Sequence, residues 1–153
     1  MTTILKIDTT DKRQTRAFLE LPFKLYRETP QWVPPLASDA ARMLDRKAHP
    51  FFRHSDAAFF LALAGNEVVG RIAALDNAHY NEYNRERTAF FFLFECADDP
   101  GAAQALFEAA FGWARARGLV KIIGPKGFTA LDGLGLLIKG YEHRPAFGIP
   151  YNP

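Results

Sequence analysis

The sequence predicts an α/β fold, of the kind also classed as α+β, with its elements in the order β-α-α-β-β-β-α-β. Two apolar runs joined by Gly65-Asn66 predict a β-hairpin, because both residues tolerate the positive φ of a two-residue turn. An apolar stripe with a 3.6-residue period over residues 103–114 predicts an amphipathic helix. The 14 phenylalanines among 153 residues predict a sheet core packed with aromatic rings.

The first part of the chain predicts one strand and two helices. Residues 4–8 alternate between apolar and polar and predict a short strand. Thr9, Thr10 and Asp11 offer N-cap side chains for a helix that Pro22 either kinks or divides. The stretch TPQWVPPL predicts a turn or an extended linker. A second helix is then expected from Ser38, as its cap, to about residue 47.

The second part predicts the hairpin, a third strand, a helix and a last short strand. The segment DNAHYNEYNRER reads as a polar loop before the strand TAFFFLFECA. Asp98 or Asp99 then caps the amphipathic helix, Pro100 suits its first turn, and Gly118 ends it. LVKIIG predicts a strand, and residues 124–153 form an irregular segment rich in glycine and proline. The 153 residues are expected to form one domain.

Composition and charge argue against several classes of function. The net charge is only +2 and the basic residues are interleaved with acids, so we expect no nucleic-acid partner. Cys96 is the only cysteine, which excludes an internal disulfide and a cysteine metal cage. His49 and His54 lack a carboxylate at metal-ligand spacing, so we expect no metal site. No segment resembles a signal peptide or a membrane span, which predicts a cytoplasmic protein without a membrane partner.

Two glycine patterns and two single residues could carry chemistry. Gly65 and Gly70 have phosphate-loop spacing, but a strand follows where a helix is required. The glycines after residue 132 lack the third glycine of a dinucleotide-binding loop. Cys96 has no obvious base partner and is interpreted as a strand residue of the core. Glu95 ends a phenylalanine-rich strand: burial would raise its pKa and make it a general base, whereas an emerging strand would turn it to solvent.

The element order and four strings resemble the GNAT acetyltransferase superfamily. The strings are HPFFRH, VGRIAALDNAHYNEYN, FFFLFECADDPGAAQALFEAAFGWARARG and GPKGFTALDGLGLLIKGYEHRPAFGIPYNP. They are similar, in this order, to the N-terminal part of a bacterial group of GNAT-like proteins whose functions are mostly unassigned. The resemblance implies a mixed, mostly antiparallel sheet with flanking helices. It also implies a domain that is incomplete at its C-terminus and lacks the last helix and strands.

The resemblance implies a place for acetyl-CoA or another acyl-CoA. In GNAT enzymes the donor lies where the fourth and fifth strands splay apart, and its pyrophosphate rests on the start of the next helix. This implies donor contacts from Phe92, Leu93, Phe94, Cys96, Gly101 and Ala102, with Glu95 as the base. Asp98 and Asp99 disfavour a pyrophosphate at this corner, because like charges repel. The acceptor amine would lie near Asn77, Gly124, Pro125, Tyr151 and Asn152.

Two hypotheses of different classes follow. The first is an acyl-CoA-dependent N-acyltransferase, or the N-terminal part of one, that acts on a small-molecule amine. The second is a non-catalytic assembly module, because a sheet that ends at LVKIIG would leave an apolar edge open to a second copy. The second hypothesis predicts a homo-oligomer, and the two do not exclude each other.

Overall fold

The computed structural model describes residues 2–146, and its strands form one five-stranded sheet in the order β1-β2-β3-β4-β5. The first four strands, β1 (Thr2–Lys6), β2 (Asp56–Ala64), β3 (Glu67–Asp76) and β4 (Thr88–Cys96), pair with one another antiparallel. The short β5 (Lys121–Ile123) runs parallel to β4 and ends the sheet. The sheet is therefore mixed and mostly antiparallel, as expected.

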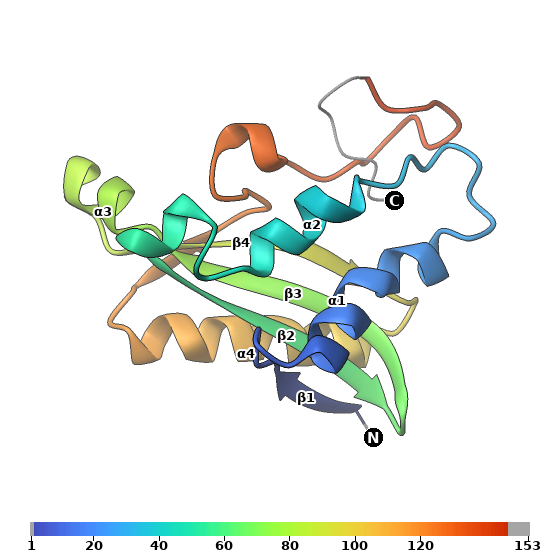
Figure 1. Ribbon diagram of the computed structural model, residues 1–153, viewed down its shortest axis with the longest axis horizontal. Helices are drawn as coiled ribbons and strands as arrows, with labels where there is room; N and C mark the ends of the chain where they lie inside the picture. The colour runs from blue at the N-terminus through green and yellow to red at the C-terminus, as the bar shows by residue number, and fades with distance from the viewer. Residues whose placement is uncertain (1, 147–153) are drawn as a thin grey trace.

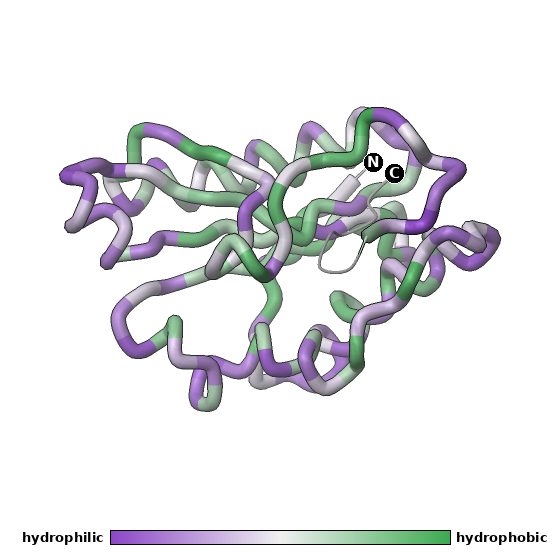
Figure 2. Tube along the Cα trace, turned by 90° about the horizontal axis from the view of Figure 1, so that it is seen from above, coloured by the Kyte–Doolittle hydropathy of each residue, from purple (hydrophilic) through white to green (hydrophobic). Residues whose placement is uncertain are grey.

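Helices cover both faces of this sheet (Figure 1). α1 (Lys12–Leu25) and α2 (Ala37–Leu44) lie on one face, together with the 3-10 helix η1 (Pro50–Arg53). The long α4 (Pro100–Ala116) lies on the other face and packs on β2 and β3. α3 (Ala78–Asn84) connects β3 to β4, and a second 3-10 helix, η2 (Ala130–Asp132), follows β5. Hydrophobic segments run through the middle of the molecule and hydrophilic ones lie at its rim (Figure 2).

Several expected elements are confirmed, together with the turn and cap residues that predicted them. Gly65-Asn66 turns the chain between β2 and β3. Asp11 caps α1, because its side chain accepts hydrogen bonds from the backbone N–H groups of Arg13 and Gln14. Asp99 caps α4, with Pro100 in its first turn. Gly118 follows α4 at a φ of +74°, in the left-handed region that glycine adopts without a steric penalty.

Other local expectations are wrong. The first strand begins two residues earlier than expected, and α2 has Leu36, not Ser38, at its N-cap with no side-chain hydrogen bond. The expected polar loop contains α3, which buries none of its side chains. Its N-terminus is instead held by Asn77, whose side chain accepts a hydrogen bond from the Tyr80 N–H at 3.0 Å. A helix without an apolar stripe gives no periodic signal, so its caps are the only clue.

Pro22 lies inside α1 and does not divide it. Proline has no N–H group, so the carbonyl of Phe18, four residues earlier, cannot form its ordinary helical hydrogen bond. That carbonyl has another partner, Arg71 of β3, at 2.7 Å from Nη1. A hydrogen bond therefore joins α1 to β3 at the residue where the helical hydrogen-bond pattern of α1 is interrupted.

After β5 the chain is irregular up to residue 146, apart from η2 and one isolated bridge between Lys126 and Leu134. Phe128 returns from this segment into the core on the α1 and α2 face, against Phe51 and Phe92. Tyr151 and Asn152 lie outside the described residues. Within residues 2–146, no helix has the length and apolar character needed to cross a bilayer.

Candidate active site

A β-bulge in β4 decides which face of the sheet carries Glu95. Arg71 pairs with Glu95 and Ala73 with Phe92, so two residues of β4 oppose one of β3. Within the bulge, Leu93 has a φ of +50°, which is unusual for a residue with a branched side chain. Strict alternation from Phe92 would turn Glu95 toward α4. The extra residue turns it toward α1 and α2 instead, on the same face as Arg71.

Arg71 and Glu95 form a buried ion pair. Nε and Nη2 of Arg71 both lie close to Oε2 of Glu95, at 2.8 and 2.7 Å. The two side chains are 7% and 12% exposed. The guanidinium also lies over the Phe18 ring, 5.0 Å from its centroid. Burial raises the pKa of the Glu95 carboxyl, and the Arg71 charge opposes that rise. The interpretation of Glu95 as a solvent-facing residue is therefore wrong.

The pair lies at one wall of an apolar cavity of about 240 Å³. Its other walls come from α1, from the linker between α1 and α2, from α2 and from the bulge of β4. These lining residues are Leu19, Pro22, Trp32, Val33, Pro35, Ala40, Met43 and Leu93. Asp39 and Asp132 also line it, so three carboxylates and one guanidinium face the cavity. This surplus of negative charge suits a ligand that carries an ammonium group.

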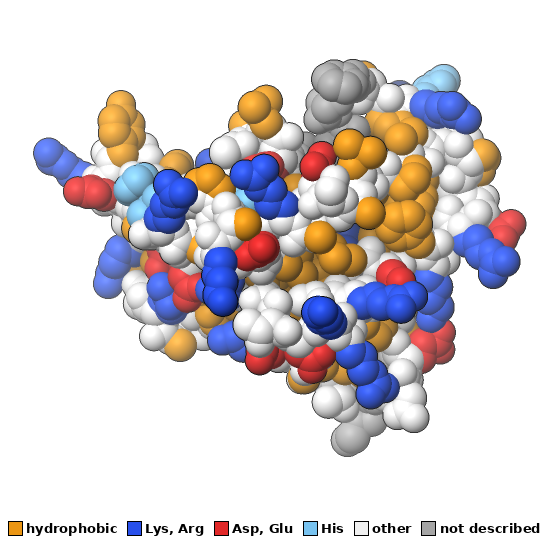
Figure 3. Space-filling model, in the orientation of Figure 1, with side chains coloured by type: hydrophobic (Ala, Val, Ile, Leu, Met, Phe, Trp, Pro, Cys, Tyr) orange, Lys and Arg blue, Asp and Glu red, His pale blue; other side chains and the backbone are white. Residues whose placement is uncertain are grey.

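The cavity adjoins a larger pocket on each side. An open trough of about 870 Å³ shares Leu19, Pro35 and Ala40 with the cavity and continues past the half-exposed Phe23. Figure 3 shows hydrophobic side chains gathered where α1, the linker and α2 come together. A polar pocket of about 770 Å³ shares Asp39, Met43 and Asp132 with the cavity.

The polar pocket contains Asn77, which was predicted to contact the acceptor, and three histidines. The rings of His54 and His79 are stacked, with centroids 3.7 Å apart. His49 instead packs on the Phe128 ring, 4.4 Å away. No group of three potential metal ligands comes together within the described residues.

The predicted donor residues lie along and just after β4. Beyond Phe90 the pairing with β5 stops, and the outer edge of β4 from residue 92 to 96 has no strand partner within residues 2–146. Phe92 is buried in the core, and Phe94 packs on Phe107 of α4. Gly124 packs against Phe91, so Gly124 and Pro125 follow β5 without lining the Glu95 cavity.

Cys96 lies on the α4 face beside Gly70. Burial and the nearby charge of Asp99 raise the pKa of its thiol, so it is a protonated thiol at neutral pH. This agrees with its interpretation as a structural strand residue.

The start of α4 does not fit a pyrophosphate group. The Asp99 carboxylate accepts the Ala102 N–H at 3.0 Å, and so occupies a donor that an anion would need. Pro100 has no N–H, and Gly101 lies close to the same carboxylate. Asp98 adds a second negative charge next to this turn. The N-terminus of α4 is therefore capped by the side chain of Asp99.

Comparison with solved structures identifies the fold. An aminoglycoside acetyltransferase from an uncultured soil metagenomic sample, in complex with trehalose, aligns with a TM-score of 0.58 at 16% identity. The alignment covers 82% of this chain and 77% of that one. A tandem GNAT protein from the clavulanic acid biosynthesis pathway aligns with a TM-score of 0.55 at 18% identity, over 76% of this chain and 34% of that one. This chain has the GNAT fold.

A third GNAT-fold structure contains a CoA derivative. AAC(6')-Iy in complex with the bisubstrate analogue CoA-S-monomethyl-acetylneamine aligns with a TM-score of 0.56 at 13% identity, over 83% of this chain and 80% of that one. That structure holds a CoA analogue, whereas the capped start of α4 in this chain departs from an anion site. At these identities the likeness establishes the fold alone.

Two curated proteins match at higher identity. One is named a bacterial ceramide synthase, from Caulobacter vibrioides, and is 32% identical over 141 residues. The other is Protein YghO from Escherichia coli, 33% identical over 142 residues. Each match covers 92% of this chain, but the chain spans only 37% and 36% of the length of these relatives. No family model matches the chain.

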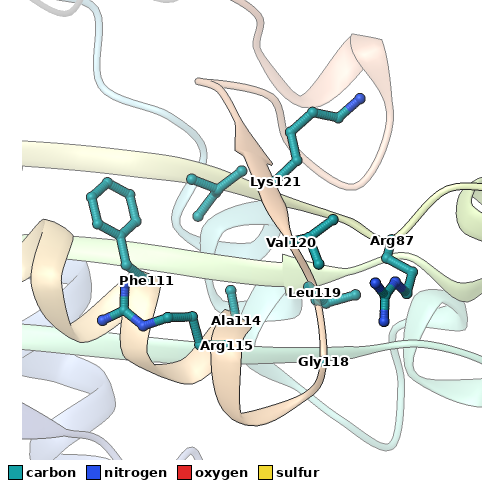
Figure 4. A pocket seen from close by; sticks show the side chains of 9 residues that line it. Arg87, Phe111, Ala114, Arg115, Gly118, Leu119, Val120 and Lys121 are labelled. Carbon is teal, nitrogen blue, oxygen red and sulfur yellow. The ribbon is translucent and has the colours of Figure 1, made fainter.

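A separate pocket of about 620 Å³ lies at the opposite end of α4, lined by Arg87, Arg115 and Lys121 around apolar side chains. Figure 4 shows that the three basic side chains come from different segments and that Lys121 points away from the other two. Lys121 also pairs with Glu86 at 2.9 Å. The basic groups therefore do not converge on one anion.

Proposed function

We propose that this chain carries the amine-activating part of an N-acyltransferase that takes an acyl thioester as donor and a long-chain amine as acceptor. The observation that carries the proposal is the Glu95 carboxylate at the wall of an apolar cavity, beside the open edge of β4. A carboxylate in such a place can bind an ammonium group and then take its proton. The GNAT fold supports acyl transfer to nitrogen as the reaction class.

In the proposed reaction, Glu95 of β4 binds the acceptor amine and the backbone of β4 binds the acyl thioester. The acceptor binds as an ammonium ion at Glu95, and the carboxylate takes one proton, directly or through a water molecule. The neutral amine attacks the thioester carbon; a C–N bond forms and the C–S bond breaks with its electrons on sulfur. The nitrogen then loses its second proton, which passes to the thiolate, so that the products are an amide and a thiol. Backbone N–H groups near residues 92–94 would hold the carbonyl oxygen, since charge develops there during attack.

The neighbouring pockets support an amphiphilic acceptor. The open trough offers Leu19, Phe23 and Pro35 to an alkyl chain, among charged side chains of α1, and the polar pocket offers groups that can bind hydroxyls. One curated relative is named a bacterial ceramide synthase. A ceramide is an amide of a long-chain amino alcohol, which has an amine between an alkyl chain and hydroxyl groups. We extend this acceptor class to the present chain.

The experiment offers the chain a long-chain acyl-CoA with either a long-chain 2-amino-1,3-diol or a polar aminoglycoside, and detects amides by mass spectrometry. We expect amide from the long-chain acceptor only, and none from Glu95→Gln. Glu82→Gln is the matched control, because Glu82 is exposed on α3. Calorimetric titration with dodecylamine tests binding alone. Absence of both heat and amide with the unmodified chain would contradict the proposal.

The open edge of β5 supports a second role, self-association. Val120 and Ile123 are 71% and 42% exposed at this edge, and such edges are commonly covered by another strand. Light scattering at tens of micromolar tests this role. A mass of two chains is expected, and a monomer mass would contradict it.

A further inference from the structure

Arg71 is a buried charged residue for which the proposed reaction has no role. It lies on β3 and only 5% of the residue is exposed. All three guanidinium nitrogens have partners: Nε and Nη2 meet Oε2 of Glu95, and Nη1 donates to the carbonyl of Phe18. A guanidinium presents its donors in a rigid fork, so these contacts fix the angle of the group as well as its place.

The contacts treat the two oxygens of Glu95 differently. Oε2 accepts the hydrogen bond from Nε of Arg71 and also forms the ion-pair contact with Nη2. Oε1 has no hydrogen-bond partner within the part of the chain that the structure describes, and Glu95 lines the cavity. One oxygen is thus committed to the protein, and the other is left to a ligand.

The position of Arg71 depends in turn on a feature of α1. Pro22 cannot donate to the carbonyl of Phe18, so this acceptor is free for Arg71. Phe18 is fully buried, with its ring edge-on to Phe59 at 5.5 Å, and cannot easily move. Pro22 therefore leaves the Phe18 carbonyl to Arg71, and Arg71 in turn holds the Glu95 carboxylate.

We propose that Arg71, held by the Phe18 carbonyl that Pro22 leaves free, is a positioning residue that makes Oε1 of Glu95 the oxygen that meets the acceptor amine. This inference rests on the proposed function. It assigns to Pro22 a role in the site that goes beyond shaping a helix. Arg71 does not touch the acceptor itself in this scheme.

Other charged groups near Glu95 must be considered in any test by pH. Arg71 faces it from β3, Asp39 from α2 and Asp132 from η2, and Tyr26 at the end of α1 lies close enough to interact with Arg71. Of these, Arg71 alone opposes the rise in the pKa of Glu95 that burial causes. Removal of the Arg71 charge should therefore raise that pKa.

The test combines the full chain with 13C-carboxyl-labelled glutamate, whose NMR shift reports the pKa of Glu95. For Arg71→Met we expect this pKa to rise by at least about one unit, and the acid limb of the kcat/KM profile to move with it, a loss of about fivefold at the original midpoint. Arg71→Lys restores the charge without the fork and should recover part of the loss. Arg13→Met, an exposed change on α1, is the matched control and should alter neither readout.

Pro22→Ala keeps the charges of Arg71 and Glu95, and it provides the test if Arg71→Met does not fold. Alanine restores an N–H that competes for the Phe18 carbonyl, so kcat/KM should fall about threefold while Tm holds or rises, since alanine favours a helix interior. An unchanged Glu95 pKa in Arg71→Met, or an unchanged kcat/KM in Pro22→Ala, would overturn the inference. If the unmodified chain transfers no acyl group, the proposed function fails, and the carboxyl titration still decides whether Arg71 controls Glu95.

Discussion

The two faces of the sheet are built on different principles. Within residues 2–146, the α4 face buries mostly alanine and no charged side chain: Ala58, Ala62, Ala74, Ala102 and Ala110 lie beside Phe60, Ile72 and Leu106. The α1 and α2 face packs large rings, yet it also buries an ion pair and contains a cavity. Close packing maximises dispersion contacts, whereas a cavity and buried charges reduce stability. The comparison indicates that one face supplies stability and the other gives some of it up for a site.

The largest effect should come from separating the ion pair on the α1 and α2 face. Arg71→Met leaves a buried carboxylate unpaired and should lower the free energy of unfolding by about 3–5 kcal/mol. The double variant Arg71→Met/Glu95→Leu buries no charge and should regain most of this loss, yet it should not bind dodecylamine. Urea unfolding and calorimetry measure the two properties. If the double variant is as unstable as the single one, the loss is not caused by an unpaired buried charge, and the contrast drawn between the two faces is wrong.

A second large effect is expected on the α4 face, without loss of the site. Leu106→Ala removes a fully buried side chain and should cost about 2–5 kcal/mol of unfolding free energy. Amine binding by the folded fraction should be unchanged, because Leu106 does not line the cavity. Val120→Ala, at an exposed position, is the control and should change stability by no more than about 0.5 kcal/mol. Loss of amine binding in Leu106→Ala would show that the faces are not independent.

The smallest effect concerns the start of α4, where the closed face reaches the proposed donor side. Asp98→Asn with Asp99→Ser removes two charges and keeps a side chain that can cap the helix. CoA should bind about fivefold more tightly, since one like-charge contact costs on the order of 1 kcal/mol at the surface. Pantetheine, which has no pyrophosphate, is the control and should bind unchanged. An equal gain for both ligands would place the pyrophosphate elsewhere.

Much of the fold could be predicted from the sequence because its signals are local. The Gly65-Asn66 turn and the Asp99 cap act over a few residues, and both were identified. α3 was missed because it has no apolar stripe. The apolar run LVKIIG predicts the short β5, but its parallel pairing with β4 depends on packing between distant segments and is not written in that run.

The site was harder to predict because it depends on a break in periodicity. Alternation along β4 gives no warning that Leu93 is an extra residue, so the face of Glu95 could not be assigned. Its partner Arg71 lies 24 residues away, and no local pattern in the sequence connects the two residues. One signal was present: a proline inside a helix leaves a carbonyl without its donor, and a buried carbonyl must find another partner.

The bulge at Leu93 also has a consequence for how this strand can change over evolutionary time. Loss of one residue there would restore regular alternation and carry the carboxylate from one layer of the protein to the other. The chain would keep Glu95 and Arg71, but the two side chains would lie on opposite faces of the sheet. A single deletion would thus separate the ion pair and leave the sheet intact, and a single insertion would restore the present arrangement.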